Sequence, residues 1–265
     1  MVITFLTDFG LQDDFVGTCH GVIARIAPDA RVIDLTHGIP PQAVLQGAVV
    51  LQATLRYLPV GVHLCVVDPG VGGERRAIAI RTADGRLFVG PDNGLLLLAA
   101  EDAGIEAVHE LADPAYRLPN VSNTFHARDI FSPAAAHLAA GVPIERLGPA
   151  IEPSDLVRVA VPQPELGRSQ VSAAVLAVDR FGNVASNLRR EHLGELGLNA
   201  GDRVEIRLTL DRYHALVADT FADAPPGELI LYEDSYGYVT VAISQGSAAR
   251  LTGMHVGDEF RVALA

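Results

Sequence analysis

The first half of the chain alternates short β-like runs with amphipathic stretches, and this alternation constrains the fold more than any other feature. Apolar residues recur at a spacing near 3.6 in the amphipathic stretches, whereas the β-like runs are rich in Val, Ile and Phe. Strands are expected at residues 2–9, 31–37 and 62–68 and, as a hairpin around an Asp-Gly turn, within 77–96, with helices at 15–28, 41–59 and 132–141. Such a pattern predicts a mostly parallel sheet flanked by helices.

The pattern changes after about residue 150. Residues 152–170 contain three prolines and are expected to form a linker. Only short strands are expected beyond it, at residues 171–179, 202–210, 228–234, 238–244 and 258–265, with Gly and Asp turns between them. They predict a small antiparallel barrel or sandwich. We therefore expect two domains, an α/β domain over 1–160 and a β-barrel domain over 168–265.

Composition narrows the class of function. The chain carries a net charge of −12, which disfavours nucleic acid as a partner and suits a cationic small molecule. All 20 basic residues are arginines, which excludes a Schiff-base lysine and a P-loop lysine. No apolar run reaches the roughly 18 residues of a membrane span, and the N-terminus lacks the basic start of a signal peptide. A cytoplasmic protein is expected, with Cys19 and Cys65 as reduced core residues because each lies in an apolar context.

Two acidic positions follow predicted strands. Asp8 ends the first one, where it could cap a helix or bind the two hydroxyls of a ribose. Asp68 ends the strand over 62–68 and is followed by PGVGG, Arg75 and Arg76. An aspartate and an arginine in a loop can form a simple surface ion pair, or they can orient a water molecule at the end of a strand.

A third polar cluster precedes the helix that begins at Ser132-Pro133. His126, Arg128 and Asp129 lie within four residues of each other, a density of ionisable groups that favours a functional site over an isolated capping histidine. The segment GPDNG at 90–94 is typical of a turn.

In the second half, residues 179–187 (DRFGNVASN) are expected to join two strands as a hairpin turn. A turn accounts for Asn183 after a glycine, but not for Asp179, Phe181, Asn183 and Asn187 together, a set able to stack on a base and to bind the charged ends of an amino acid. No HExxH, GxSxG or GxGxxG motif is present. A phosphatase-like metal site remains an alternative, assembled in space from Asp8, Asp13, Asp14, Asp68, Asp92 and His126.

Six motifs in this order resemble the S-adenosyl-L-methionine hydroxide adenosyltransferases, which are related to the 5′-halogenases. They are TDFG (7–10), VVDPGVGGERR (66–76), GPDNG (90–94), TFHARDIFSPAAA (124–136), DRFGNVASN (179–187) and SYGYVTVAISQGSAA (235–249), and they cover both halves of the chain. The resemblance implies an α/β domain, a smaller β-barrel domain and a homotrimer that binds S-adenosyl-L-methionine between the first domain of one subunit and the second domain of its neighbour. It implies no metal and no cofactor besides this substrate.

The resemblance also assigns roles to individual residues. Asp68, Arg75 and His126 would act on water, and Asp8 would bind the ribose diol. Substrate contacts from the barrel domain would come from Asp179, Phe181, Asn183, Ser235 and Ala248. The choice of Arg75 over its neighbour Arg76 rests on spacing from Asp68.

The expected reaction is hydrolysis of S-adenosyl-L-methionine to adenosine and L-methionine by in-line attack of water on the ribose C5′. Arginine does not give up its proton, so His126 or Asp68 would take the proton of the water. The halogenases carry tyrosine at the position of Asp68 and Tyr-Ser at the position of His126-Ala127, which favours water over halide here. A halogenase, a non-catalytic sensor of S-adenosyl-L-methionine and a metallophosphatase remain the alternatives.

Overall fold

The structure is a computed structural model that describes all residues from 1 to 265. The chain folds into two compact units, Met1–Val159 and Ala160–Ala265, and each is described by itself. No helix in either unit combines the length and the hydropathy that a membrane span requires.

The N-terminal unit is built on a six-stranded sheet with the order β2-β1-β3-β5-β4-β6. Its strands are β1 (Val2–Thr7), β2 (Arg31–Thr36), β3 (Val62–Val66), β4 (Ala77–Thr82), β5 (Leu87–Pro91) and β6 (Ile105–Glu110). The pairings of β1 with β2 and β3, and of β3 with β5, are parallel, whereas β4 runs antiparallel to β5 and β6. The predicted mostly parallel sheet is confirmed.

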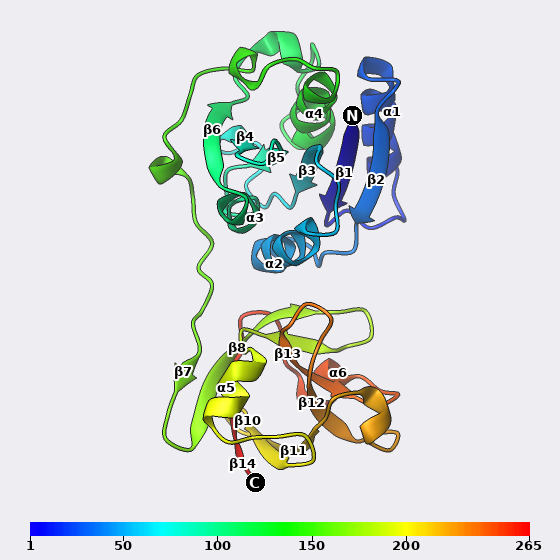
Figure 1. Ribbon diagram of the computed structural model, residues 1–265. Helices are drawn as coiled ribbons and strands as arrows, with labels where there is room; N and C mark the ends of the chain where they lie inside the picture. The colour runs from blue at the N-terminus through cyan, green and yellow to red at the C-terminus, as the bar shows by residue number, and fades with distance from the viewer. The chain divides into compact units, whose positions relative to one another are not determined.

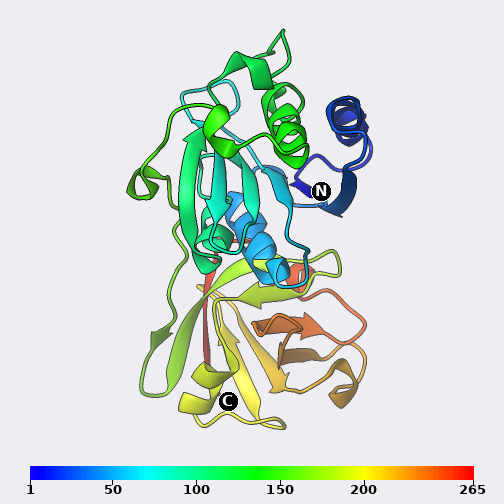
Figure 2. The same cartoon turned by 45° about the horizontal axis from the view of Figure 1, so that its top comes forward.

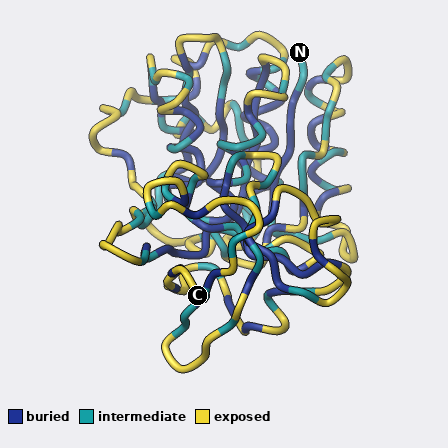
Figure 3. Tube along the Cα trace, turned by 60° about the horizontal axis from the view of Figure 1, so that its bottom comes forward, coloured by how far each residue is buried: buried dark blue, intermediate teal, exposed yellow.

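Helices cover both faces of this sheet (Figure 1). The helices α1 (Phe15–Ile26) and α4 (Ser132–Ala139) pack on one face, in one core with Ile3, Phe5 and Leu64. On the other face, α2 (Val44–Leu55) and α3 (Leu97–Asp102) share a second core with side chains from the opposite side of the same strands. Burial is densest along the central strands and the helix faces that meet them, as Figure 3 shows, and all five residues of β3 are buried.

Local structure departs from the expected elements at three places. The predicted helix over 41–59 is shorter, because Gln42 has a φ of 67° and α2 begins only at Val44. The strand β6 was not predicted. A π-helical turn, Ala127–Phe131, precedes α4. The predicted hairpin around Asp84-Gly85 is present between β4 and β5, with Gly85 at a φ of 83°.

The C-terminal unit is a closed β-barrel, not a sandwich. Its strand order is β14-β10-β11-β12-β13-β9-β8-β7, and the pairing of β14 with β8 closes the sheet on itself. In Figure 2 the yellow to red strands curve round a common interior. The strands are β7 (Glu165–Leu166), β8 (Gln170–Val178), β9 (Val184–Ser186), β10 (Arg203–Arg207), β11 (Arg212–Val217), β12 (Leu229–Glu233), β13 (Val239–Ile243) and β14 (Glu259–Leu264).

Sequence reasoning described this unit incompletely. The strands β9 and β11 were missed, and the expectation of strands alone was wrong because two short helices are present, α5 (Arg190–Glu195) and α6 (Ala248–Thr252). The barrel is not fully antiparallel, since β11 and β12 pair in parallel. Part of the predicted linker over 152–170 is also ordered: it contains a short 3₁₀ turn, Pro153–Asp155, and the edge strand β7.

The two cysteines are free and fully buried, as expected from their apolar context. Burial raises the pKa of the Cys19 thiol to about 11 and raises the pKa of Cys65 further. Both are core residues with no part in the site described below.

Candidate active site

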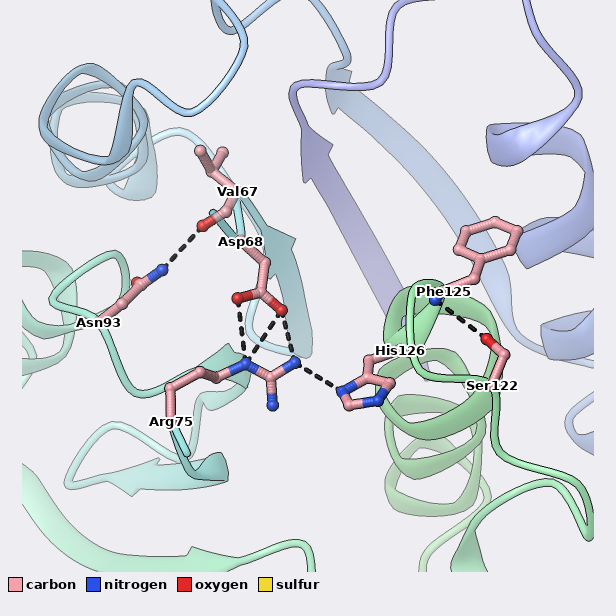
Figure 4. A network of polar contacts seen from close by, with 7 residues as sticks. All are labelled: Val67, Asp68, Arg75, Asn93, Ser122, Phe125 and His126. Atoms are coloured by element: carbon pink, nitrogen blue, oxygen red, sulfur yellow. Dashed lines mark hydrogen bonds and ion pairs between the residues drawn. The ribbon is translucent and has the colours of Figure 1, made fainter. Parts of the chain in front are cut away.

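Asp68 and Arg75 form a tight ion pair at the end of β3 (Figure 4). Arg75 Nε lies 3.0 Å from each carboxylate oxygen of Asp68, and Arg75 Nη2 lies 2.5 Å from Oδ2. The two side chains are only 6% and 12% exposed, respectively. This pair is therefore a buried, two-pronged contact and not the surface ion pair that a loop aspartate and arginine usually form.

His126 joins the pair from a different segment of the chain. Its Nδ1 lies 2.7 Å from Arg75 Nη2, across 51 positions of sequence. The buried ring of Phe131, in the π-helical turn that follows His126, lies 5.2 Å from the Arg75 guanidinium carbon. Three predicted residues, Asp68, Arg75 and His126, thus meet in one connected group, which we call the polar trio.

A glycine brings the two segments of the trio together. Gly72 has a φ of 76°, and a Cβ at this position would collide with the backbone oxygen of Asn123. The loop over 68–75 can therefore lie directly against the segment that leads to His126. Sequence reasoning had expected the glycines of PGVGG to permit the approach of a ligand, whereas at Gly72 the close approach is to the protein's own backbone.

The contact with Arg75 decides the protonation of His126. A guanidinium can only donate hydrogen bonds, so Nδ1 of His126 must accept, and the ring is neutral with its proton on Nε2. Burial lowers the pKa of His126 and the positive charge of Arg75 lowers it further, while Asp68 acts in the opposite direction. The trio therefore combines a carboxylate, a fixed cation and a neutral imidazole that presents an N–H group.

Arg76, the neighbour of Arg75, belongs to a separate contact. Its side chain binds the buried carboxylate of Asp92, with Nη2 2.6 Å from Oδ2, and it also donates to the backbone oxygen of Asp155. Asn93, next to Asp92, donates from its side chain to the backbone oxygen of Val67. The turn at 90–94 thereby holds the end of β3 in place without entering the trio.

Arg128 and Asp129 also form a pair of their own. Asp129 is fully buried, receives two hydrogen bonds from Arg128, and accepts a third from the backbone N–H of Ser122. Ser122 in turn accepts a hydrogen bond from Phe125 N. Of the three ionisable groups near residue 126, only His126 enters the trio, and the other two anchor its segment.

Asp8 lies at the same edge of the sheet as Asp68. It follows β1, whose Thr7 is in register with Val66 of β3, and the carboxyl ends of neighbouring parallel strands are where open α/β sheets bind ligands. Asp8 accepts a hydrogen bond from the backbone N–H of Gln42 at 2.8 Å. It does not cap α1, which begins at Phe15 after Asp14, so that interpretation was wrong.

The C-terminal unit carries a second group of predicted residues. Asp179 accepts hydrogen bonds from the backbone N–H groups of Phe181 and Asn183 and from the Asn183 side chain, which shapes the turn between β8 and β9. The Phe181 ring projects from this turn and is 68% exposed. All three residues line an open cavity of about 890 Å³ in this unit.

The remaining barrel positions differ in their surroundings. Asn187 does not line the cavity but ties Ala174 N to the backbone oxygen of Pro162. Ser235 is exposed in the turn after β12, and Ala248 is buried at the first position of α6. Sequence reasoning missed Phe221 and Gln245, which also line the cavity. Phe221 lies outside the six motifs, whereas Gln245 lies within the motif over 235–249, which was the available signal for it. The fold brings both residues to the cavity that Asp179 lines.

The side chains proposed for a phosphatase-like metal site do not converge. Asp68 is engaged by Arg75, and Asp92 is engaged by Arg76. The one group of three or more His, Cys, Asp or Glu side chains close enough to hold a metal ion consists of other residues, namely His20, Asp34 and His37.

A three-layer α/β unit with a polar trio at its strand ends, followed by a closed barrel with its own cavity, defines a two-domain enzyme. Family models described as the SAM hydroxide adenosyltransferase N-terminal and C-terminal domains match residues 3–148 and 173–261, respectively. The chain belongs to the S-adenosyl-L-methionine hydroxide adenosyltransferase family.

Individual proteins agree with this assignment. The chain is 49% identical to (R)-S-adenosyl-L-methionine hydrolase of Salinispora tropica, over 98% of this chain and 97% of that protein. It is 28% identical to the fluorinase of Actinopolyspora mzabensis, over 98% of this chain and 96% of that one. A solved structure of an uncharacterized conserved protein from Thermotoga maritima superposes with a TM-score of 0.90 at 38% identity, covering 98% of this chain and 99% of the other.

Proposed function

We propose that this protein is an enzyme that hydrolyses S-adenosyl-L-methionine to adenosine and L-methionine. The observation that carries the proposal is the connected trio of Asp68, Arg75 and His126 at the carboxyl edge of the sheet. The family assignment and the 49% identity to a protein named (R)-S-adenosyl-L-methionine hydrolase support the same substrate and reaction.

The reaction is an in-line displacement at the ribose C5′. The oxygen of water forms a bond to C5′ while the C5′–S bond breaks, and the bonding pair leaves with sulfur. Because the sulfonium departs as the neutral thioether of methionine, the leaving group needs no proton. The difficult part is the nucleophile, since bulk water has a pKa of about 15.7. One proton must leave the water as the new C–O bond forms.

The geometry of the trio favours Asp68 as the acceptor of this proton. His126 Nδ1 is occupied by Arg75 and its Nε2 carries a hydrogen, so the ring has no free lone pair. Asp68 Oδ1 receives only one hydrogen bond, at 3.0 Å from Arg75 Nε, which leaves a second lone pair for a water proton. Arg75 Nη1 and His126 Nε2 are the donors that would orient the water oxygen and stabilise its developing negative charge.

Substrate contacts are assigned to the edge of the sheet and to the barrel cavity. Asp8 would bind the ribose hydroxyls with the carboxylate oxygen that Gln42 leaves free. Phe181, exposed at the cavity, offers a face for the adenosyl group, and Asp179 and Asn183 offer polar atoms to the methionine end. Ser235 and Ala248 complete the proposed set. No metal or other cofactor takes part in these steps.

The test is to incubate the purified protein with S-adenosyl-L-methionine, excess chloride and a chelator in water enriched in ¹⁸O, and to identify the products by chromatography and mass. Adenosine with ¹⁸O at its 5′ oxygen and unlabelled methionine are expected. Chlorinated adenosine would identify a halogenase, and unchanged bound substrate would identify a sensor. Loss of activity in chelator would identify a metal-dependent enzyme.

A homotrimer with shared sites is a further part of the proposal. If one subunit supplies Asp68 and its neighbour supplies Asp179, inactive Asp68→Asn and Asp179→Ala chains should restore activity when they are mixed, unfolded and refolded together. Random assembly would make about a quarter of the sites intact. Light scattering would give the mass of a trimer. Absence of restored activity in well-mixed trimers would place the whole site in one chain.

We also propose that the enzyme acts in the cytoplasm. Two free, buried thiols are typical of proteins in a reducing compartment, which supports the cytoplasm.

A further inference from the structure

Two histidines and an aspartate converge in the N-terminal unit, and none of them belongs to the polar trio. His20 comes from α1, Asp34 from β2, and His37 directly follows the end of β2. Asp34 Oδ1 lies 2.8 Å from His20 Nε2 and 3.1 Å from His37 Nε2. All three atoms lie within 4.8 Å of one another. Two segments, α1 and the end of β2, therefore bring one oxygen and two imidazole nitrogens close together.

The imidazole of His37 provides an independent indication of a ligand. Its side chain is only 3% exposed, and Nε2 makes no hydrogen bond of good geometry in the protein, its nearest acidic neighbour being Asp34 Oδ1 at 3.1 Å. A buried polar nitrogen without a partner is costly. Here that nitrogen lies within 4.8 Å of both other ligand atoms.

The other side of the His37 ring is held in the way that metal ligands usually are. Its Nδ1 lies 2.8 Å from the buried hydroxyl oxygen of Thr7, and its ring makes an edge contact with Phe5 at 4.9 Å. A metal-binding histidine commonly donates its second ring N–H to such an oxygen, which fixes both the tautomer and the ring orientation. Thr7 thus leaves the Nε2 lone pair of His37 available for a cation.

Two of the three spacings are close to those around a tetrahedral ion. Zinc bonds of about 2.0–2.1 Å to nitrogen and oxygen place two ligand atoms roughly 3.3 Å apart in a tetrahedron. The distances from Asp34 Oδ1, 2.8 Å and 3.1 Å, need to change by up to about half an ångström, and the two Nε2 atoms, which lie within 4.8 Å of each other, need to take up the same spacing. Both imidazoles use Nε2, and two imidazoles with a carboxylate are a common zinc ligand set.

We propose that His20, Asp34 and His37 bind one Zn²⁺ ion through His20 Nε2, Asp34 Oδ1 and His37 Nε2. The fourth position remains open to solvent, since the His20 and Asp34 side chains are 35% and 44% exposed. The ion has no role in the hydrolysis, because its ligands are not members of the trio. It neighbours the loop after β1, since His37 O accepts a hydrogen bond from Gly10 N and Thr7 Oγ1 accepts one from Phe9 N.

The test is a zinc titration of the full-length, chelator-stripped protein, without a histidine tag, in competition with a chromophoric zinc indicator. One equivalent per chain is expected to bind. Because loss of an outer-shell partner alone typically weakens metal affinity 10–100-fold, removal of a direct ligand in His20→Ala or Asp34→Asn should weaken it by about 100-fold or more. Circular dichroism spectra that match the parent protein would show that both variants are folded.

His255→Ala is the matched control. His255 is an exposed histidine beside one carboxylate, 3.7 Å from Asp258, and it has no third ligand. Its removal should leave the stoichiometry and affinity unchanged. Failure of the parent protein to bind one equivalent would overturn the proposal, as would binding that survives both His20→Ala and Asp34→Asn or that is lost in His255→Ala. All of these outcomes are measured as zinc binding and not as turnover. The proposed function is tested separately, by product formation in the presence of chelator.

Discussion

Two aspartate–arginine pairs with buried carboxylates lie at the carboxyl edge of the same sheet, and only one of them contacts a histidine. Asp68 pairs with Arg75 and thereby with His126, whereas Asp92 pairs with Arg76. The aspartate side chains are 6% and 3% exposed, and each receives short hydrogen bonds from Nε and Nη2 of its arginine. Asp92→Asn is therefore a matched structural control for Asp68→Asn.

The expected effects on turnover differ between the two variants. Asp68→Asn keeps the size of the side chain but removes the proposed proton acceptor, a contribution worth about 10²–10⁴ in rate. At about 1.36 kcal/mol per factor of ten, kcat should fall by the equivalent of roughly 3–5 kcal/mol, with KM changed less than about threefold. Asp92→Asn should keep kcat within about threefold of the parent enzyme, because Asp92 touches no member of the trio.

Both variants should lose stability, and Asp68→Asn should lose more. Breaking a buried pair costs up to about 3–5 kcal/mol, and the Arg75 side chain left by Asp68→Asn is only 12% exposed, whereas the Arg76 side chain left by Asp92→Asn is 32% exposed and can be solvated. The assays are chromatographic measurement of adenosine over a range of substrate concentrations and denaturant unfolding of each variant. If Asp92→Asn lowers kcat as much as Asp68→Asn does, the carboxylate of Asp68 supports the structure and does not act on water.

Three other predictions test the site. The pKa of His126 lies below its ordinary value of 6.5, so the imidazole is neutral at pH 6.5 and above. If catalysis requires this neutral ring, kcat should fall on acidification with a midpoint below pH 6.5. A midpoint above pH 6.5 would contradict the neutral imidazole. Gly72→Ala would force a Cβ against Asn123 O and separate the two segments of the trio, so kcat should fall at least about tenfold. The control Gly141→Ala, also at a positive φ but in open space, should retain kcat. Asp179→Ala should raise KM at least about tenfold with a smaller change in kcat, and an unchanged KM would remove Asp179 from the substrate site.

Segments whose pattern extends over a whole element could be predicted from sequence. The helix α1 shows the 3.6-residue period because one side of it faces a core, whereas β1 and β3 are continuous apolar runs because both sides of each strand are buried. The Asp-Gly turn between β4 and β5 was found for a different reason: Gly85 adopts the positive φ that such a turn requires.

Elements that depend on distant partners could not be predicted. The strand β9 has only three residues, Val184–Ser186, and exists because β8 and β13 pair with it on either side. Polar residues are frequent in β11, whose pairing with β10 and β12 offsets its weak pattern. A residue pattern records the side of an element that is buried, but not which strand will lie beside it.

The candidate site, like the fold, has features that the sequence predicts and features that only the tertiary structure decides. The sequence by itself determined which chemical groups are available, because each depends on a short local segment. These groups are an acid after a buried strand, two arginines in a glycine-rich loop, and a histidine before a helix. Only the tertiary structure decided that Arg75 meets Asp68 and His126 while its neighbour Arg76 meets Asp92. The same holds for His20 on α1, which only the fold brings to Asp34 and His37 at the end of β2. Distances between side chains far apart in sequence are set by how strands and helices pack, and a linear pattern does not contain them.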